Sequence, residues 1–133
     1  MPATVLDSYA LIAYFRGEPA GVAVKELLQT ASQTGRTAHM TEVNYAEVKY
    51  TLIRKDGIQA WTQAREVLAA LPIEFHPVTR ELSDLAADFK ARHTLSLADA
   101  FAAALAKLRK AELVTGDPEL KAVGSEVKIR WLG

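Results

Sequence analysis

The sequence predicts an α/β fold, a three-layer sandwich in which helices flank a mostly parallel five-stranded sheet. Two observations support it. Five short apolar runs rich in residues that favour strands alternate with longer stretches whose apolar residues recur at helical spacing. Glycine, proline or a capping residue falls at most of the boundaries between them. Strands that alternate with helices in this way usually pair in parallel, with the helices packed on the sheet.

The expected elements follow one another without a long linker. The expected strands lie at residues 3–6, 37–40, 73–78, 112–115 and 127–132. The expected helices lie at residues 8–16, 20–31, 42–56, 58–71, 80–92 and 96–108, with a short one after Pro118. Thr41 is an expected N-cap, and Gly57 and Pro72 end the helices before them, because glycine and proline interrupt helical structure.

Composition limits the possible classes of protein. The chain of 133 residues fits a single domain, residues 1–133, and has no cysteine, which excludes disulfides, thiolate metal sites and a cysteine nucleophile. Sixteen basic residues balance sixteen acidic ones, so any positive surface for a nucleic acid must be local. There is no signal peptide pattern and no long apolar run, so we expect a cytoplasmic protein without a membrane segment.

The helix expected at residues 96–108 carries an acidic residue at its start. Residues 100–106 are all apolar, and a helix that is apolar around its circumference is usually buried. Asp99 is therefore expected close to the core. A structural alternative is a capping box, in which Ser96 and Asp99 satisfy the first N–H groups of the helix.

Three other acidic residues are expected near the same edge of the sheet. Asp7 follows the first strand, and Asp117 follows the fourth. Asp99 would lie about 4.5 Å along its helix, and Glu47 roughly 9 Å along the helix after Thr41, at a rise of 1.5 Å per residue. Because parallel strands end at a common edge, where ligands bind, all four carboxylates can converge on one crevice.

Converging carboxylates call for a cation, since two of them 4 Å apart repel by about 4 kcal/mol at an effective dielectric constant of 20. Oxygen ligands suit Mg²⁺, with Mn²⁺ as a substitute. The three histidines, His39, His76 and His93, fit no ligand spacing and are expected to be surface or core residues. Each acid could instead be a helix cap or a solvated residue. Glu42 competes with Glu47 for the fourth position, but Glu47 borders the face that we expect to be apolar, which is marked by Val43, Ala46, Tyr50 and Ile53.

Four segments give the chain a resemblance to the PIN-domain ribonucleases, and within them to VapC-like toxins of toxin–antitoxin pairs. The segments are VLDSYALIAYF at residues 5–15, NYAEV at 44–48, LSLADA at 95–100 and LVTGDP at 113–118. The resemblance implies a sheet ordered 3-2-1-4-5 and a divalent metal held by the catalytic residues Asp7, Glu47, Asp99 and Asp117, with Thr115 at the edge of the site. It also implies RNA as substrate, a cognate antitoxin as partner and a homodimer.

Two further interpretations remain. Arg16, Lys49, Arg54 and Lys55 are candidates for phosphate contacts, although a solvated charged face is the better explanation for any one of them. A different class of protein, a receiver-like phospho-acceptor domain, is also a small α/β sheet with acids at strand ends. It fits less well, because Ser8 stands where receivers have the second acid of a pair and Glu47 lies within a helix. Two further alternatives are a PIN-domain nuclease outside a toxin–antitoxin pair and a PIN fold that serves only as an interaction scaffold.

Overall fold

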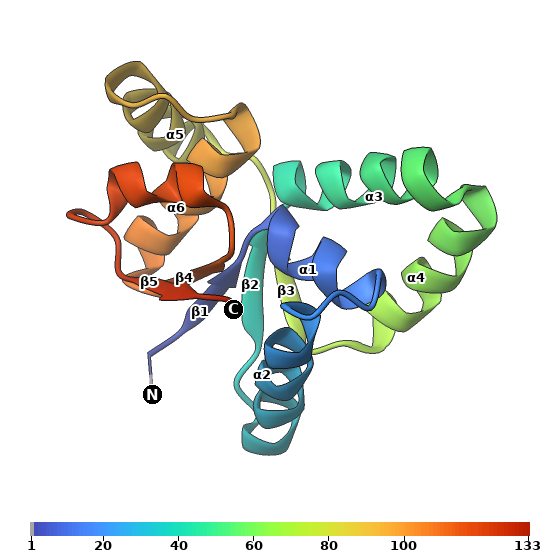
Figure 1. Cartoon of the computed structure of the whole chain (residues 1–133). Coiled ribbons are helices and arrows are strands. Elements are labelled where there is room, and N and C mark those ends of the chain that lie inside the picture. Colours follow the sequence, from blue (N-terminus) through green and yellow to red (C-terminus); the bar gives the residue numbers. More distant parts are fainter. Residues whose placement is uncertain (1) are drawn as a thin grey trace.

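The computed structural model describes residues 2–133 and contains a sheet of five parallel strands in the order β3-β2-β1-β4-β5 (Figure 1). All four strand pairings are parallel, so the sheet is wholly parallel. The predicted fold class and the strand order are confirmed, and the third and last strands are shorter than expected. The strands are β1 (Thr4–Leu6), β2 (Ala38–Thr41), β3 (Ile73–His76), β4 (Glu112–Thr115) and β5 (Ile129–Trp131).

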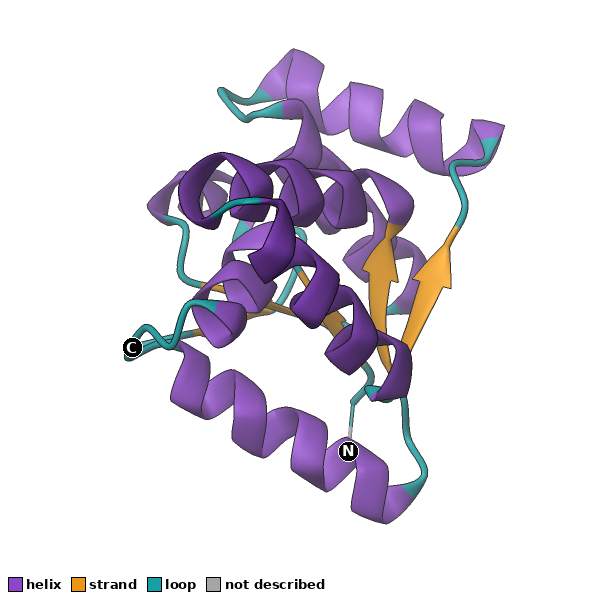
Figure 2. Ribbon diagram, turned by 90° about the vertical axis from the view of Figure 1, so that its right-hand side faces the viewer, coloured by secondary structure: helices purple, strands orange, loops and turns teal. Residues whose placement is uncertain are grey.

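Helices cover both faces of this sheet (Figure 2). Neighbouring residues of a strand point to opposite faces, and Val5 and Leu6 accordingly belong to two different hydrophobic cores. One core lies against α5, α6 and the 3₁₀ helix η1, and the other against α1 to α4. The helices are α1 (Ser8–Phe15), α2 (Gly21–Thr34), α3 (Glu42–Asp56), α4 (Ile58–Ala70), α5 (Arg80–Arg92), α6 (Leu97–Arg109) and η1 (Pro118–Val123).

Helix α6 is the buried helix that its composition predicts. Every residue from Ala98 to Ala106 is buried, including Asp99. The helix packs against α5, α3 and strands β1, β2 and β4. A carboxylate at its first turn is therefore placed inside the protein by the packing of the apolar residues that follow it.

The buried face of α3 differs from the one predicted. Its fully buried residues are Asn44, Val48 and Leu52, whereas Tyr50 is 46% exposed. The prediction was wrong because it assigned the apolar residues to one stripe, while the observed stripe begins with an asparagine. That asparagine is buried with its hydrogen bonds satisfied, so a polar residue can lie on the core side.

Two of the three histidines lie side by side, which their spacing in the sequence does not indicate, and His39 is buried, within the expected range of surface or core positions. His39 lies in β2 and His76 in β3, and the distance between His39 Nδ1 and His76 Nε2 is 2.9 Å. The parallel register between the two strands places them together, although 37 positions separate them in the sequence. His93 lies elsewhere, at the end of α5, beside Glu126. Within the described residues no helix has the length and apolar character needed to cross a bilayer.

Candidate active site

Asp7 is completely buried at the carboxyl end of β1. It is the N-cap of α1, and its Oδ1 accepts the N–H of Ala10 at 2.9 Å. Its other oxygen, Oδ2, accepts a short hydrogen bond from the hydroxyl of Thr115. Burial raises the pKa of Asp7 to about 7, with smaller contributions from the charges of Asp117 and Glu47. Asp7 therefore caps α1, but its ionised carboxylate is a buried charge, which is energetically unfavourable.

Thr115 connects Asp7 to Asp117. Its hydroxyl donates to Asp7 and accepts the N–H of Asp117 at 2.9 Å. Asp117 is itself the N-cap of η1, since its Oδ1 accepts the N–H of Glu119 at 3.0 Å. Gly116 lies between them because a Cβ atom there would come within 2.3 Å of the Tyr9 ring. The loop after β4 can therefore approach the start of α1 closely.

Asp99 is 5% exposed and makes only half of the predicted capping box. Its backbone N–H donates to Ser96 Oγ at 3.1 Å, but the reciprocal bond from Ser96 N–H to its carboxylate is absent among the described residues. Its Oδ2 is buried without a hydrogen-bond partner in residues 2–133. Burial is the largest cause that raises the pKa of Asp99 to about 8, and the neighbouring carboxyl group of Asp117 is the next.

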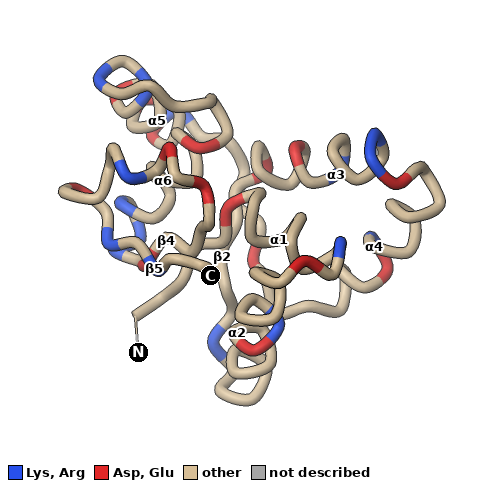
Figure 3. Tube along the Cα trace, in the orientation of Figure 1, with Lys and Arg blue, Asp and Glu red and all other residues tan. Residues whose placement is uncertain are grey.

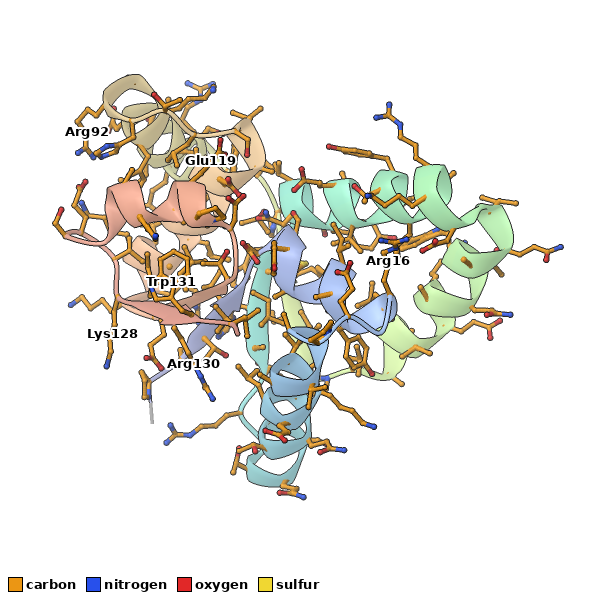
Figure 4. The ribbon with its side chains drawn as sticks, viewed as in Figure 1. Arg16, Arg92, Glu119, Lys128, Arg130 and Trp131 are labelled. Carbon is orange, nitrogen blue, oxygen red and sulfur yellow. The ribbon has the colours of Figure 1, made fainter. Side chains whose placement is uncertain are left out.

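A third acidic side chain, Glu119, lies beside Asp99 and Asp117, and it was not among the predicted site residues. One carboxylate oxygen from each of the three residues lies within 4.8 Å of the others. Figure 4 shows Glu119 in the half of the molecule that contains α5, α6 and η1. Its position two residues after Asp117, in the first turn of a helix, was the available signal.

Glu47 lies at the margin of this site. It is half-buried, its Oε2 accepts the Tyr50 hydroxyl at 3.3 Å, and its charge contributes to the raised pKa of Asp7. It is not part of the close carboxylate cluster, and Glu42 is exposed at the start of α3. Acidic segments from α3, from the loop after β1 and from the loop after β4 surround the centre of the molecule (Figure 3). The structure thus brings Asp99 and Asp117 together, and Thr115 links Asp7 to Asp117. Asp7, like Glu47, lies outside the close cluster and interacts with the other acids through its charge.

Asn44 holds the elements that carry the acids, a role that the sequence analysis did not assign. Its side-chain Nδ2 donates to Ser8 Oγ at 3.0 Å and to the carbonyl oxygen of Ala98 at 3.1 Å. Ser8 follows Asp7, and Ala98 precedes Asp99. Its Oδ1 accepts from the hydroxyl of Thr41. A polar residue on the buried stripe of α3 was the signal for this network.

Replacing Asn44 with alanine should destabilise the protein by about 2–4 kcal/mol, because the substitution leaves buried partners on α1 and α6 unsatisfied and opens a small cavity. Chemical denaturation measures the free energy of unfolding. Thr62→Ala is the control, since the Thr62 hydroxyl bonds to Ile58 on an exposed surface, and should cost less than about 0.5 kcal/mol. Equal losses for the two variants would contradict the assigned role of Asn44.

Three of the four basic residues considered for phosphate contacts have other partners, and the fourth, Lys55, is exposed near the end of α3. Arg16 forms a salt bridge with Asp56 at 3.0 Å, and Lys49 and Arg54 lie over the rings of Trp61 and Tyr50. No salt bridge within residues 2–133 joins a lysine or arginine to Asp7, Asp99, Asp117 or Glu119. The lysines and arginines of this part of the chain therefore do not pair with the negative charge of the site.

This site fits a divalent cation. Its side-chain groups are carboxylates and one threonine hydroxyl, the oxygen donors that Mg²⁺ and Mn²⁺ prefer. The unpartnered Oδ2 of Asp99 and the raised pKa values of Asp7 and Asp99 mark where positive charge is missing. Caps and a metal site are compatible here, because capping uses one oxygen of Asp117 and the backbone N–H of Asp99.

Comparisons with known proteins agree on the family. The model of the PIN domain matches residues 4–126, and the comparison with curated proteins gives no match. Among solved structures, the chain is similar to a toxin–antitoxin complex from Klebsiella pneumoniae, with a TM-score of 0.71 and 18% identity over 96% of each chain. It is also similar to VapC20 of Mycobacterium tuberculosis, described as a sarcin–ricin loop cleaving toxin, with a TM-score of 0.75 and 18% identity over 92% of this chain and 95% of that one.

A third similar structure is VapBC2 from Rickettsia felis bound to a DNA fragment from its promoter. Its TM-score is 0.75, with 13% identity over 98% of this chain and 99% of that one. At such low identities these likenesses establish the fold, while the family model covers nearly the whole chain. The wholly parallel sheet and the acids at its carboxyl edge agree with that match, and the chain belongs to the PIN-domain family.

Proposed function

We propose that the protein is a divalent-metal-dependent endoribonuclease that acts as the toxin of a toxin–antitoxin pair. The observation that carries the proposal is the buried Oδ2 of Asp99, which has no hydrogen-bond partner, within a carboxylate cluster that forms no salt bridge with a lysine or arginine of residues 2–133. The family and the toxins among the similar structures support the choice of RNA hydrolysis over other phosphoryl chemistry.

The proposed catalytic residues are Asp7, Glu47, Asp99 and Asp117, with Mg²⁺ as cofactor and Mn²⁺ as its substitute. A bound divalent ion would lower the pKa of a water molecule and neutralise charge on the scissile phosphate. Asp7 and Asp99 would be its direct ligands, with Asp117 and Glu47 completing the site or orienting the water. Thr115 and the N–H of Ala10 fix the Asp7 carboxylate in one orientation, which keeps the ligand set preorganised.

Cleavage of purified total RNA tests this proposal. The protein should cleave RNA with Mg²⁺ or Mn²⁺ and lose the activity in excess chelator. Asp99→Asn should reduce the rate by roughly a hundredfold or more, the range for loss of an important electrostatic group. Asp84→Asn, on the exposed face of α5, is the matched control and should keep full activity. Undiminished cleavage in chelator, or by Asp99→Asn, would refute the proposal.

The receiver-like alternative is disfavoured by topology. Receivers have the strand order 2-1-3-4-5, whereas this sheet is ordered 3-2-1-4-5. Glu47 also lies in the second turn of α3, where no strand precedes it directly. Incubation with a labelled acyl phosphate should leave no stable aspartyl phosphate, and a stable label would instead support the receiver class.

A cognate antitoxin is the proposed protein partner, suggested by the toxin–antitoxin complexes among the similar structures. We expect it to place an arginine or lysine among the carboxylates. A guanidinium would supply the positive charge that is missing beside Asp7 and Asp99, as their raised pKa values indicate. Expression of the toxin alone, in the cytoplasm where we expect it to act, should arrest growth, and coexpression of the neighbouring gene should restore it. Harmless expression of the active enzyme would favour a nuclease outside such a pair.

A homodimer is also part of the proposal. Exposed apolar side chains of α3 and α4, Tyr50, Ile58 and Val67, are available for a two-fold contact. Light scattering coupled to gel filtration should give twice the mass of the chain, and a monomer at high concentration would exclude this arrangement.

A further inference from the structure

A second group of side chains that can bind metal lies away from the acidic site, on β2 and β3. In the register of these strands His39 is opposite Glu74, and His76 is opposite Thr41, two residues after His39. Side chains opposite each other, or two residues apart, share one face of a sheet. His39 is also opposite Val5, which belongs to the core beneath α6. The three side chains therefore meet on the α6 face, at the edge formed by β3.

The three ligand atoms converge on a common point. His39 Nδ1 is 2.9 Å from His76 Nε2, His76 Nε2 is 3.0 Å from Glu74 Oε2, and His39 Nδ1 is 3.9 Å from the same oxygen. Ligand atoms bound to a tetrahedral zinc ion at about 2.0–2.1 Å lie about 3.3 Å apart, within the observed range. An ion equidistant from the three atoms would lie roughly 2.0 Å or slightly more from each.

Hydrogen bonding does not account for this convergence. His76 Nε2 is close to both His39 Nδ1 and Glu74 Oε2. A ring nitrogen carries either one N–H or one lone pair, so the two contacts cannot both be well-directed hydrogen bonds. If His76 Nε2 donates to Glu74, it carries no lone pair that could accept a hydrogen bond from His39. If it accepts from His39, its lone pair faces a carboxylate oxygen. A cation among the three atoms satisfies all of their lone pairs.

The protonation and accessibility of the group suit metal binding. Burial, with the positive charge of Arg109 as a smaller cause, lowers the pKa of His39 and of His76. Both imidazoles are then neutral at pH 7, which is the form that ligates metals. Glu74 supplies a negative charge that offsets Arg109, and its side chain is 55% exposed, so an ion can reach the group from solvent.

We propose that His39, Glu74 and His76 form a binding site for one transition-metal ion of the zinc type, separate from the oxygen-lined catalytic site. Two imidazoles and one carboxylate favour such ions over Mg²⁺, and three protein ligands leave a position for water. The site joins β2 to the edge strand β3 through side chains, so an ion bound there would secure that edge. This inference does not depend on ribonuclease activity.

Isothermal titration with Zn²⁺ in the presence of excess Mg²⁺ tests the proposal without RNA. The Asp99→Asn protein should bind one Zn²⁺, since its impaired acidic site leaves the histidine site intact. Adding His76→Gln or Glu74→Gln to it should weaken that binding by at least about tenfold. Both replaced residues lie near the sheet edge rather than in the core, and circular dichroism and melting curves would verify that the variants fold. Adding His93→Gln, at the end of α5, is the matched histidine control and should leave Zn²⁺ affinity unchanged.

Three results would refute the proposed zinc site. They are the absence of Zn²⁺ binding in both the wild type and Asp99→Asn, binding in the wild type that Asp99→Asn abolishes, and binding that His76→Gln and Glu74→Gln leave unchanged. The second result would assign the zinc to the acidic cluster. Failure of the ribonuclease assay would leave this measurement unaffected, so the two proposals fail independently.

Discussion

Asp99→Asn should lose most of the thermal stabilisation that Mg²⁺ gives to the wild-type protein, while its metal-free form should be as stable as the wild type or more stable. In the metal-free protein the Asp99 carboxylate is buried beside Asp117 and Glu119, which raises its pKa to about 8. Asparagine keeps the shape of the side chain and removes one of the repelling charges. The gain from relieved repulsion offsets any loss of side-chain hydrogen bonding.

The size of the metal effect distinguishes a metal ligand from a simple helix cap. Wild type should gain about 2.7 kcal/mol at a hundredfold excess of Mg²⁺ over its dissociation constant, and the variant much less. Loss of a capping side chain would instead cost about 1 kcal/mol with or without metal. The cap of α6 survives the substitution, because it consists of the backbone N–H of residue 99 and the hydroxyl of Ser96.

Thermal melts of each protein in chelator and in Mg²⁺ measure these differences. Asp84→Asn removes an exposed acidic charge from α5 and serves as the control, with a metal-induced shift equal to that of the wild type. Equal shifts in the wild type and Asp99→Asn would remove Asp99 from the proposed ligands, and no shift in either protein would exclude Mg²⁺ binding at the acidic cluster.

The fold and part of the site could be predicted because they depend on local patterns. Strand ends lie at one edge of a parallel sheet, so the positions of Asp7 and Asp117 followed from counting elements. The burial of Asp99 followed from the apolar residues of α6. The prediction for Glu47 was less accurate, because the distance of a residue along a helix does not give the direction in which its side chain points.

The missed residues depend on contacts between elements distant in the sequence. Asn44 bonds to Ser8 and Ala98, which are 36 and 54 positions away. His39 meets His76 only through the register of β2 and β3, which the sequence pattern does not specify. Glu119 depends on the 3₁₀ turn that brings it back toward Asp99.

Without metal, the protein should become less stable as the pH rises from about 6.5 to 8.5. The folded-state pKa is about 7 for Asp7 and about 8 for Asp99, against an ordinary value of 3.8. Over this range the folded protein holds protons that the unfolded chain has already released, so the free energy of unfolding falls as the pH rises. The stability that comes from these two protonated carboxyl groups is fully present below pH 3.8. It is lost once the pH has risen above the folded-state pKa values of about 7 and about 8.

Other groups set the lower limit of this pH window. Burial lowers the pKa of His39 and His76, so protonation of these residues on unfolding destabilises the protein below about pH 6.5 and opposes the carboxylate effect. Salt bridges and hydrogen bonds to Arg92 and Lys107 lower the pKa of Glu126 to about 2, and this group matters only at still lower pH. Above pH 6.5 the two buried aspartates dominate the slope.

Urea denaturation in chelator at a series of pH values measures this slope, which should reach about 1.4 kcal/mol per pH unit for each group that titrates. Asp99→Asn should reduce the slope, with the remaining part due to Asp7, and the exposed Asp84→Asn control should retain it. Saturating Mg²⁺ should flatten the wild-type profile, because carboxylates that bind a cation stay ionised in the folded protein. A wild-type slope that neither Asp99→Asn nor Mg²⁺ changes would show that other residues titrate in this range, and that the charge at the carboxyl edge of the sheet is already compensated.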